Sequence, residues 1–510
     1  MKKNVIIIVI IVIAIVAGLI VVRNNKIKND YEVVKITGFD YFKYISNQKC
    51  GVIDKEGNKI IDAKYTDIII PNPQKDVFFC YENDNIVILN AKGEKLYQDF
   101  KNVEPVKLKN VATTLNYEKE LFKYEKDGRW GLINIDGKQI VKPEYEEIEN
   151  LQLREGIFLV KKNGKFGIIN GNGVCIVNPE YDGIVSDGFY TEEHGYNKSG
   201  FIVSTKIEDG YRYGYINFQG KKYLSNEFNS IERIDIDDYK EVYLIASKNG
   251  RYGVYKNRKN IIEEEYQSIE YNVANKLLLI EKNKKYGVTD LEGKIIIEPE
   301  NTSIEFKGIY VYAKKGLENI VYDINGDKIN ISFNKALYET ESENYRISTL
   351  ENDNEIFYGI VDKNGNTLVS EKYQFIEYAF GTYFVEKNED GLFGIISSNG
   401  KEVVKSKYNV LQKLKGKKVL QAVDSKTGIM DLYNSNLRLL YSLKDANISS
   451  EDEYIKVVSE SGIIYLDKDG NEIDKDSDLV KSSNKLQEPE KVGKYKKVQF
   501  TLENVYYVEE

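Results

Sequence analysis

Short alternating stretches of apolar and polar residues recur along most of the chain, and turn signals separate them. Residues 157–162 and 165–170 flank Asn163-Gly164, a dipeptide typical of a two-residue type I′ hairpin. A second turn follows at residues 170–173, and a third apolar stretch, such as residues 139–142, ends at a proline. Tyr145 and Ile148 are then expected to open the next short strand. The pattern predicts antiparallel meanders of three to four strands.

This meander is repeated with a period near 36 residues. Each copy has a key position, usually a glycine after an aromatic residue, and ten copies have a second glycine six residues later, which Lys259 and Asn434 replace in the other two. We place twelve copies, with key positions 51, 87, 131, 167, 214, 253, 287, 320, 359, 394, 428 and 464. A period of this length predicts stacked units that share one continuous core.

The recurring residues have predicted structural roles. A glycine inside a strand weakens it, so its recurrence indicates that another backbone or ring lies close against it. The aromatic residue before it and the later tyrosine are expected to form contacts between units. Trp130, Phe166, Tyr252, Tyr286 and Phe393 in particular are expected to be buried. The structural repeat positions are Gly51, Trp130, Gly131, Tyr145, Phe166, Gly167, Tyr181, Tyr213, Gly214, Tyr252, Gly253, Tyr286, Gly287, Tyr358, Gly359, Phe393 and Gly394.

The predicted fold class is therefore all-β. An array of about twelve antiparallel β-meander repeats occupies residues 31–475, either propeller-like or as an open solenoid, after one N-terminal transmembrane helix. Residues 476–510 form a polar spacer and C-terminal strands, which either cap the last unit or complete an earlier one.

The membrane prediction rests on an unbroken apolar run at residues 5–22. Eighteen helical residues span about 27 Å, close to the thickness of a bilayer core. Residues 1–4 form a short basic tail, and residues 23–30 a polar linker. A cleaved signal peptide and a buried core helix are the alternatives. We expect an uncleaved signal-anchor with the repeats outside the cytoplasm, although basic residues on both flanks nearly balance.

The Trp130-Gly131 pair and its variants resemble the WG-repeat family of bacterial proteins. The resemblance covers residues 40 to 475; one copy keeps Trp, six have Phe or Tyr instead, and five have a non-aromatic residue. It implies β-rich repeats in proteins that are often associated with the cell envelope, and it implies no single activity.

Composition removes several kinds of chemistry. The chain has 510 residues and a net charge of -8, which disfavours nucleic acid as a partner. One histidine, His194, and three cysteines cannot form a histidine-rich metal site, a four-cysteine zinc site or a dense disulfide scaffold. Cys50 and Cys175 occupy apolar repeat positions and are expected in the core. The Asp-x-Asn/Asp-Gly turns are interpreted as capped turns and not as calcium loops. We predict no catalytic residue, cofactor or metal site.

The expected function is that of a non-enzymatic binding or scaffold protein at the envelope, with a protein or glycan as partner. A carboxylate-based envelope hydrolase and a structural spacer are the alternatives. An insertion at residues 186–210 interrupts the regular spacing, and inserted loops often form the binding face of a repeat array. Its aromatic residues are the candidate binding residues: Phe189, Tyr190, Tyr196 and Phe201.

Overall fold

The computed structural model describes most of the repeat region and the C-terminal strands. It covers residues 31, 34, 36–83, 85–109, 116–151, 155–187, 200–236, 241–450, 453–483, 489–501 and 504–509. The predicted membrane segment at residues 5–22, with the tail and linker beside it, lies outside the described residues. Within them, no helix has both the length and the apolar character to cross a membrane.

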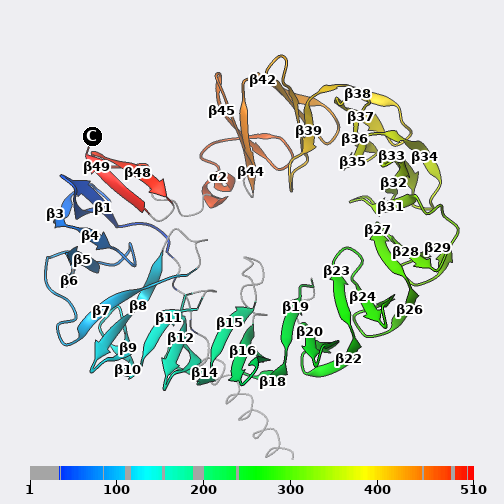
Figure 1. Cartoon of the computed structure of the whole chain (residues 1–510). Coiled ribbons are helices and arrows are strands. Elements are labelled where there is room, and N and C mark those ends of the chain that lie inside the picture. The colour runs from blue at the N-terminus through cyan, green and yellow to red at the C-terminus, as the bar shows by residue number, and fades with distance from the viewer. Residues whose placement is uncertain are drawn as a thin grey trace, which may run out of the picture. The chain divides into compact units, whose positions relative to one another are not determined.

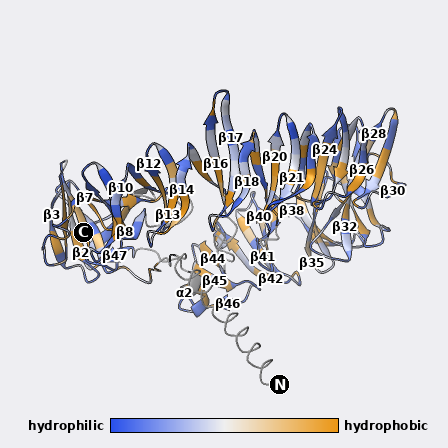
Figure 2. Ribbon diagram, turned by 90° about the horizontal axis from the view of Figure 1, so that it is seen from below, coloured by the Kyte–Doolittle hydropathy of each residue, from blue (hydrophilic) through white to orange (hydrophobic). Residues whose placement is uncertain are grey.

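The described residues form twelve β-sheets, which we number in chain order (Figure 1). Sheets 2 to 12 are simple meanders in which consecutive strands pair, and all but sheet 2 have four strands. Apolar residues gather in the strands and hydrophilic residues in the turns that join them (Figure 2). The prediction of an all-β array of antiparallel meanders is confirmed, with one sheet for each predicted repeat.

The chain divides into two compact units, residues 1–264 with 486–510 and residues 265–485, and the first boundary falls within β22. The strands of sheets 1 to 6 are as follows: sheet 1, β1 (Tyr41–Ser46), β2 (Lys49–Asp54), β3 (Lys59–Tyr65), β47 (Lys491–Val492), β48 (Tyr495–Thr501) and β49 (Asn504–Glu509); sheet 2, β4 (Asp67–Ile69), β5 (Phe78–Glu82) and β6 (Asn85–Leu89); sheet 3, β7 (Lys101–Lys107), β8 (Tyr117–Lys126), β9 (Arg129–Asn134) and β10 (Gln139–Tyr145); sheet 4, β11 (Glu147–Asn150), β12 (Ile157–Lys162), β13 (Lys165–Asn170) and β14 (Cys175–Tyr181); sheet 5, β15 (Gly183–Asp187), β16 (Gly200–Ile207), β17 (Gly210–Asn217) and β18 (Lys222–Phe228); sheet 6, β19 (Ser230–Ile234), β20 (Tyr243–Lys248), β21 (Arg251–Lys256) and β22 (Lys259–Tyr266).

The second unit contains sheets 7 to 12 and one short helix. Its elements are as follows: sheet 7, β23 (Ser268–Asn272), β24 (Leu277–Lys282), β25 (Lys285–Thr289) and β26 (Ile295–Asn301); sheet 8, β27 (Ser303–Lys307), β28 (Tyr310–Lys315), β29 (Glu318–Asp323) and β30 (Lys328–Ile329); sheet 9, β31 (Lys335–Glu339), β32 (Tyr345–Asn352), β33 (Glu355–Asp362) and β34 (Thr367–Tyr373); sheet 10, β35 (Phe375–Phe380), β36 (Tyr383–Lys387), β37 (Phe393–Ser397) and β38 (Glu402–Tyr408); sheet 11, β39 (Val410–Lys413), β40 (Val419–Asp424), β41 (Ile429–Asn434) and β42 (Leu439–Lys444); sheet 12, β43 (Asn447–Ser450), β44 (Tyr454–Ser459), β45 (Gly462–Asp467) and β46 (Glu472–Ile473); helix, α2 (Asp478–Ser483).

Sheet 4 shows why the sequence of one repeat forms a four-stranded meander. Asn163 and Gly164 have φ of 52° and 74°, which is the type I′ geometry predicted for the β12–β13 hairpin. At the next turn, Asn170 Oδ1 accepts the backbone N–H groups of Asn172 and Val174, both at 3.0 Å. The side chain therefore caps the turn, as predicted.

The fourth strand of the repeat in sheet 4 differs from the prediction. β14 does not stop at Pro179 but continues to Tyr181, so the later tyrosine ends this strand and does not open the next. Phe166 pairs with Tyr181 and Ile168 with Val177, which leaves three residues of β14 opposite Gly167 alone. Pro179 lies in this bulge, where its missing N–H costs no ladder hydrogen bond. β10 continues in the same way through Pro143 to Tyr145, and β26 passes through Pro299.

The bulge explains the recurring glycine. A Cβ atom on Gly167 would lie 2.6 Å from the carbonyl oxygen of Val177 and 2.7 Å from the nitrogen of Pro179. Gly131 and Gly359 have the same contact, each with a carbonyl oxygen 2.5 Å from the ideal Cβ position. The predicted close approach of another backbone is thus confirmed.

Three copies without the glycine lack the long fourth strand that passes over the key position in the sheets that have the glycine. Where glycine is present, at positions 51, 131, 167, 214, 253, 287, 359 and 394, the fourth strand has seven or eight residues. Where Ile320 or Ile464 replaces it, β30 and β46 have two residues each. At Val87, the described part of sheet 2 has only an isolated bridge between Leu89 and Lys95. In these three copies, a side chain at the key position accompanies a fourth strand that is shortened to two residues or reduced to a bridge.

The eleventh copy requires a correction. Asn434 caps the turn of sheet 11 by accepting the N–H groups of Asn436 and Arg438, both at 3.0 Å, as Asn170 does in sheet 4. Three residues before this cap lies Asp431, so Asp431 and not Gly428 holds the key position. β42 pairs directly across this position, with Ser442 opposite Asp431, and its register shift lies further along, between Leu432 and Tyr433. In this sheet the Asp431 carboxylate, 5% exposed, occupies the place that the glycine and the strand passing over it have in the sheets with the glycine.

We expect Gly167→Ala to destabilise sheet 4 by about 1–3 kcal/mol, because the added methyl must push β14 away from β13. Protection of the β13 and β14 amides in hydrogen exchange would measure this loss. Gly38→Ala is the control, since nothing lies within 4 Å of its ideal Cβ position and its φ is not positive. Equal effects of the two substitutions would contradict the explanation of the glycine.

The core lies between neighbouring sheets. One cluster combines Leu132 and Tyr145 of sheet 3 with Ile148 and Phe158 of sheet 4, and the next continues from Ile168 into sheet 5. The prediction that neighbouring repeats share a core is confirmed. The predicted burial of the later tyrosines is also confirmed, with Tyr145 7% and Tyr181 3% exposed.

The burial predicted for the aromatic residues before the glycine is wrong in degree. Trp130, Phe166, Tyr252, Tyr286 and Phe393 are all half-buried. Each stands on the third strand, and lysines of the second strand cover several of these rings. The Nζ atom of Lys123 lies 4.4 Å from the Trp130 ring centroid, and that of Lys161 lies 5.4 Å from the Phe166 centroid. Trp130, Phe166 and Phe393 therefore combine a half-buried ring with a cation–π contact to a lysine of the second strand.

The C-terminal strands complete the first sheet. β49 pairs in parallel with β1, with Tyr507 opposite Tyr44, and takes the place that a first strand has in the other sheets (Figure 1). The Tyr507 ring lies 5.1 Å from Phe42, and Tyr495 lies 5.3 Å from Tyr44. Of the two predicted roles for residues 476–510, completion of an earlier unit is correct.

Candidate functional site

The loops of each meander differ sharply between the two ends of the strands. The second and third strands are joined by two residues in ten of the twelve sheets (β1–β2 in sheet 1). The loops between first and second strands vary from two residues, at 308–309 and 381–382, to twelve, at 188–199. We call the end that carries these variable loops the loop rim, and the opposite end the hairpin rim. Variable loops on one side of a repeat array often form its binding face.

Loop rims of neighbouring sheets lie next to one another within each unit. In the first unit, the backbone N–H of Lys109 in sheet 3 donates to Asn150 Oδ1 in sheet 4, at 3.4 Å. In the second unit, the N–H of Ile309 in sheet 8 donates to the carbonyl of Leu337 in sheet 9, at 2.8 Å. A ligand can therefore contact loops of several sheets at once.

A buried polar cluster lies at the loop rim of sheets 3 and 4. The Glu118 side chain is fully buried, and its carboxylate accepts hydrogen bonds from Asn150 Nδ2 at 2.9 Å and from the Gly156 N–H at 2.9 and 3.0 Å. Beside it, Lys119 and Glu155 form a largely buried ion pair at 2.9 Å. Glu118 on β8 thus binds both ends of the loop at residues 151–156.

Burial dominates the electrostatics of this cluster. Burial first, and the negative charge of Glu155 second, raise the pKa of Glu118 to about 8, while the hydrogen bonds from Gly156 and Asn150 oppose this rise. Burial also raises the pKa of Glu155, while Lys119 opposes this. Tyr31 completes the cluster: burial and then the charge of Glu118 raise its pKa, and its ring occupies the space above Gly156 and Gly171.

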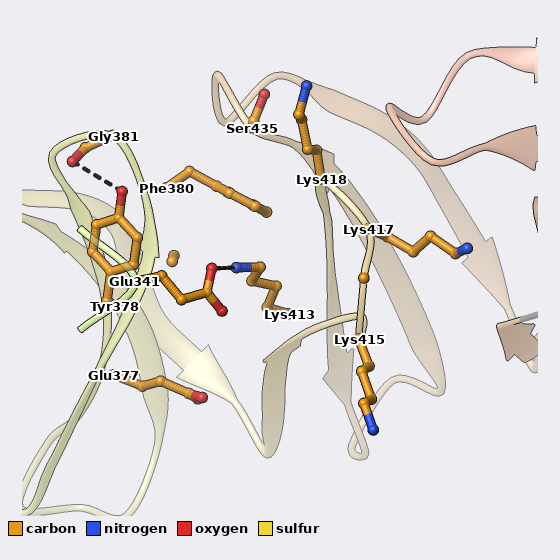
Figure 3. A pocket seen from close by; sticks show the side chains of 12 residues that line it. Glu341, Glu377, Tyr378, Phe380, Gly381, Lys413, Lys415, Lys417, Lys418 and Ser435 are labelled. Atoms are coloured by element: carbon orange, nitrogen blue, oxygen red, sulfur yellow. Dashed lines mark hydrogen bonds and ion pairs between the residues drawn. The ribbon is translucent and has the colours of Figure 1, made fainter. Parts of the chain in front are cut away.

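The second unit has a cleft of about 690 Å³ on its loop rim (Figure 3). Tyr378 and Phe380 come from β35, Glu341 from the loop of sheet 9, and Lys413 from the end of β39. The Glu341 carboxylate faces the Lys413 amine, and the two form an ion pair (Figure 3). The Lys413 amine also lies 5.2 Å from the Phe380 ring centroid.

The loop at residues 414–418 forms one wall of this cleft. The Lys417 N–H donates to the Leu414 carbonyl at 3.0 Å, and Gly416 has a φ of 70°, as the third position of a type II turn requires. This turn presents Lys415, Lys417 and Lys418 in three different directions (Figure 3). Lys418 pairs with Asp469 at 2.8 Å.

Comparison with protein families identifies the repeat. The model of the WG containing repeat matches residues 51–71 and 130–166, which include the third and fourth strands of sheets 1 and 3. The chain therefore contains repeats of the WG type at these residues. Comparison with curated proteins gave no match.

Solved structures show only a distant likeness to the WG-repeat array. Kluyveromyces lactis Hsv2p is 12% identical, with 39% of this chain and 73% of that chain covered and a TM-score of 0.21. A eukaryotic initiation factor is 10% identical over 85% and 94% of the two chains, with a TM-score of 0.21. BamB from Moraxella catarrhalis is 13% identical over 48% and 87%, with a TM-score of 0.20. TM-scores this low carry no argument about function.

The candidate binding residues of the insertion are only partly described. Phe189, Tyr190 and Tyr196 lie outside the described residues, as does His194. Phe201 is fully buried in the core between sheets 4 and 5, so its proposed contact with a partner is wrong. The error arose because residues 200–207 form strand β16 and only residues 188–199 lie between β15 and β16.

The cysteines also differ from one another. Cys50 and Cys80 are buried, but Cys175 is exposed at the start of β14, which corrects its predicted core position. Its Sγ atom lies 3.4 Å from Asn178 Oδ1.

Sequence reasoning missed both polar sites on the loop rim. Glu118 lies in the charged stretch Tyr117–Lys126, which has the sequence of a solvated strand. Lys413 ends β39 directly before a lysine-rich turn, and its partner Glu341 is 72 residues away. The only available signal was the variable length of the loops between repeats.

Proposed function

We propose that this WG-repeat protein is a membrane-anchored, non-enzymatic binding or scaffold protein that presents its loop rim to a protein or glycan of the cell envelope. The observation that carries the proposal is the concentration of long, variable loops at one end of a regular β framework. A framework of this kind holds loops in fixed relative positions, which favours recognition over an extended surface.

The proposed anchor is residues 5–22, and Tyr31 supports a connection between anchor and loop rim. The Tyr31 ring lies against Gly156 and Gly171, where a Cβ atom on either glycine would overlap it. Eight residues, 23–30, separate it from the predicted span. Fully extended, they reach about 27 Å. In the anchored protein, the loop rim of sheet 4 would therefore lie within that distance of the bilayer.

The alternative of a carboxylate-based hydrolase has one observation in its favour, the raised pKa of Glu118 beside Glu155. Its burial argues against the role, since a fully buried carboxylate that accepts three hydrogen bonds from Asn150 and Gly156 is inaccessible to substrate. We interpret Glu118 as a residue that fixes the loop. Turnover of a cell-wall glycan by the purified protein would establish the hydrolase instead.

Protease treatment of intact cells tests the anchor and its orientation. We expect the repeats to be digested without lysis, and residues 1–22 to stay with the membrane fraction. Digestion only after lysis would place the repeats in the cytoplasm, and release of the intact array into the medium would indicate a cleaved signal peptide.

Replacing residues 188–199 by Asn-Gly tests the binding role of the loop rim. This change keeps β15 and β16, whereas deletion of residues 186–210 would remove β16. We expect loss of partner capture from an envelope extract with an unchanged circular dichroism spectrum. Insertion of Gly-Ser into the Asn249-Gly250 turn on the hairpin rim is the matched control. Full capture by the loop variant would favour the structural spacer.

A further inference from the structure

The cleft in the second unit exists because of a difference in loop length. The first loop of sheet 10 is only Gly381-Thr382, while the corresponding loops of sheets 9 and 11, residues 340–344 and 414–418, have five residues each. The two longer loops rise on either side of the short one. Glu341 reaches across the gap to Lys413, two sheets away.

The cleft is lined by positive charge in an acidic protein. Lys413, Lys415 and Lys418 extend along it against two carboxylates, those of Glu341 and Glu377, whereas Lys417 is 3% exposed and its side chain points away from the cleft (Figure 3). Lys418 is also paired with Asp469. The whole chain has a net charge of -8. A local reversal of sign at a hollow surface favours the capture of anions.

Lys413 is already arranged to hold an anionic group. Its side chain is only 18% exposed, and the contact with Phe380 fixes its amine at the floor of the cleft. The carboxylate now paired with it belongs to Glu341, whose side chain is 71% exposed. An ion pair with so exposed a partner contributes about 0–1 kcal/mol, so a competing anion can displace Glu341 at little cost.

The remaining lining adds a ring and a hydroxyl. Tyr378 borders the cleft with a half-buried ring, and Ser435 contributes a hydroxyl group from the opposite wall (Figure 3). Aromatic rings provide an apolar face for a sugar, while hydroxyl and amine groups bind its polar substituents. We propose that this cleft binds an anionic saccharide, a sugar that carries a carboxylate or phosphate group. The proposal rests on the proposed function in taking the loop rim as the binding surface, and it names the ligand class.

A second cleft, of about 790 Å³, provides a contrast. It lies on the hairpin rim between sheets 8 and 9, and its Lys307 pairs with both Glu305 and Glu351 at 3.4 Å. Glu305, Glu351 and Asp353 outnumber Lys307 and Lys314 in its lining. Its charges are thus satisfied internally and have the opposite balance, so it does not share the predicted preference for anions.

Calorimetric titration of the full chain tests the proposal with tetragalacturonate, galactose 6-phosphate, neutral maltotetraose and tetraglutamate. We expect the two anionic sugars to bind, more weakly at high salt, and maltotetraose to bind at least about tenfold more weakly. The relative affinity of the first two distinguishes a carboxylate from a phosphate ligand. Lys413→Gln should weaken anionic sugar binding about tenfold or more, whereas Glu341→Gln should strengthen it by up to about fivefold, because it removes the competing carboxylate.

Lys426→Gln is the matched control, an exposed lysine of the same sheet on the hairpin rim, and it should change nothing. Thermal unfolding shows whether each variant folds, and the gain expected for Glu341→Gln cannot arise from misfolding. No binding of either anionic sugar at millimolar concentration, equal effects of Lys413→Gln and Lys426→Gln, or equal binding of maltotetraose would overturn the proposal. Tighter binding of tetraglutamate would identify an acidic peptide site instead. None of these outcomes affects the capture assay with the loop at 188–199, which tests the proposed function in the other unit.

Discussion

Tyr507→Ala is expected to destabilise sheet 1 by about 3–5 kcal/mol, the usual cost of removing a large buried aromatic side chain. The Tyr507 ring is 1% exposed and packs against Phe42, and its hydroxyl donates to the Pro489 carbonyl at 2.5 Å. β49 should then separate from β1, which would leave β1 without its parallel partner. Hydrogen exchange of the β1 amides measures the effect directly.

A substitution at an exposed position of the same strand provides the control. Glu509→Ala changes an exposed side chain of the same strand and should leave β1 protection nearly unchanged. Ending the chain after residue 488 removes all three C-terminal strands and should exceed the effect of Tyr507→Ala. Undiminished protection of β1 after truncation would show that the C-terminal strands do not complete sheet 1.

Glu118 is expected to make the first unit less stable as the pH rises. The pKa of Glu118 is about 8 in the folded protein, against an ordinary value of 4.5. Below pH 4.5 the carboxyl is protonated in both states, and no penalty arises. Between pH 4.5 and 8 the unfolded chain ionises while the folded chain keeps its proton, so stability falls by about 1.4 kcal/mol per pH unit.

Glu118→Gln should remove this dependence, because the amide keeps an acceptor for Gly156 and Asn150 and cannot ionise. The variant should match the native protein below about pH 4.5 and exceed it increasingly up to pH 8. Glu155, Glu120, Lys119 and Tyr31 surround the site, and burial raises the pKa values of Glu155 and Glu120 as well, so the difference between the two proteins is the measured quantity. Thermal unfolding at several pH values provides it, with Glu147→Gln on the exposed surface of sheet 4 as the control. Parallel curves for native and variant proteins would contradict the assignment.

The parts of the fold that could be predicted depend on residues close in sequence. The Asn163-Gly164 hairpin, the Asn170 cap and the spacing of the key glycines are local, so turn chemistry and period were sufficient to find them. The burial of Trp130 was overestimated because one face of its ring is met by the amine of Lys123 and not by apolar residues of a neighbouring sheet. Pro179 was taken as a strand end because the bulge that accommodates it depends on a glycine in the neighbouring strand.

The candidate sites could not be predicted because their partners are distant in sequence. Nothing near Tyr44 indicates that Tyr507 lies opposite it, and nothing near Glu341 indicates Lys413. Glu118 is surrounded in sequence by charged residues, and only the fold shows that loop residues 150 and 156 bury it. Loop lengths were the exception: they can be read from the sequence, and they identify the rim that carries both polar sites.

The pairing of β1 with β49 also has a consequence for synthesis. Strand β1 leaves the ribosome early, but its partner at Tyr507 follows more than four hundred residues later. At about 5–20 residues per second, the delay is roughly 20–90 s. During this time β1 has an unpaired row of backbone N–H and C=O groups, which can add a strand from another nascent chain. Strand β1 therefore depends on residues 504–509 for its partner, and chains terminated before these residues are the species that should aggregate or be degraded.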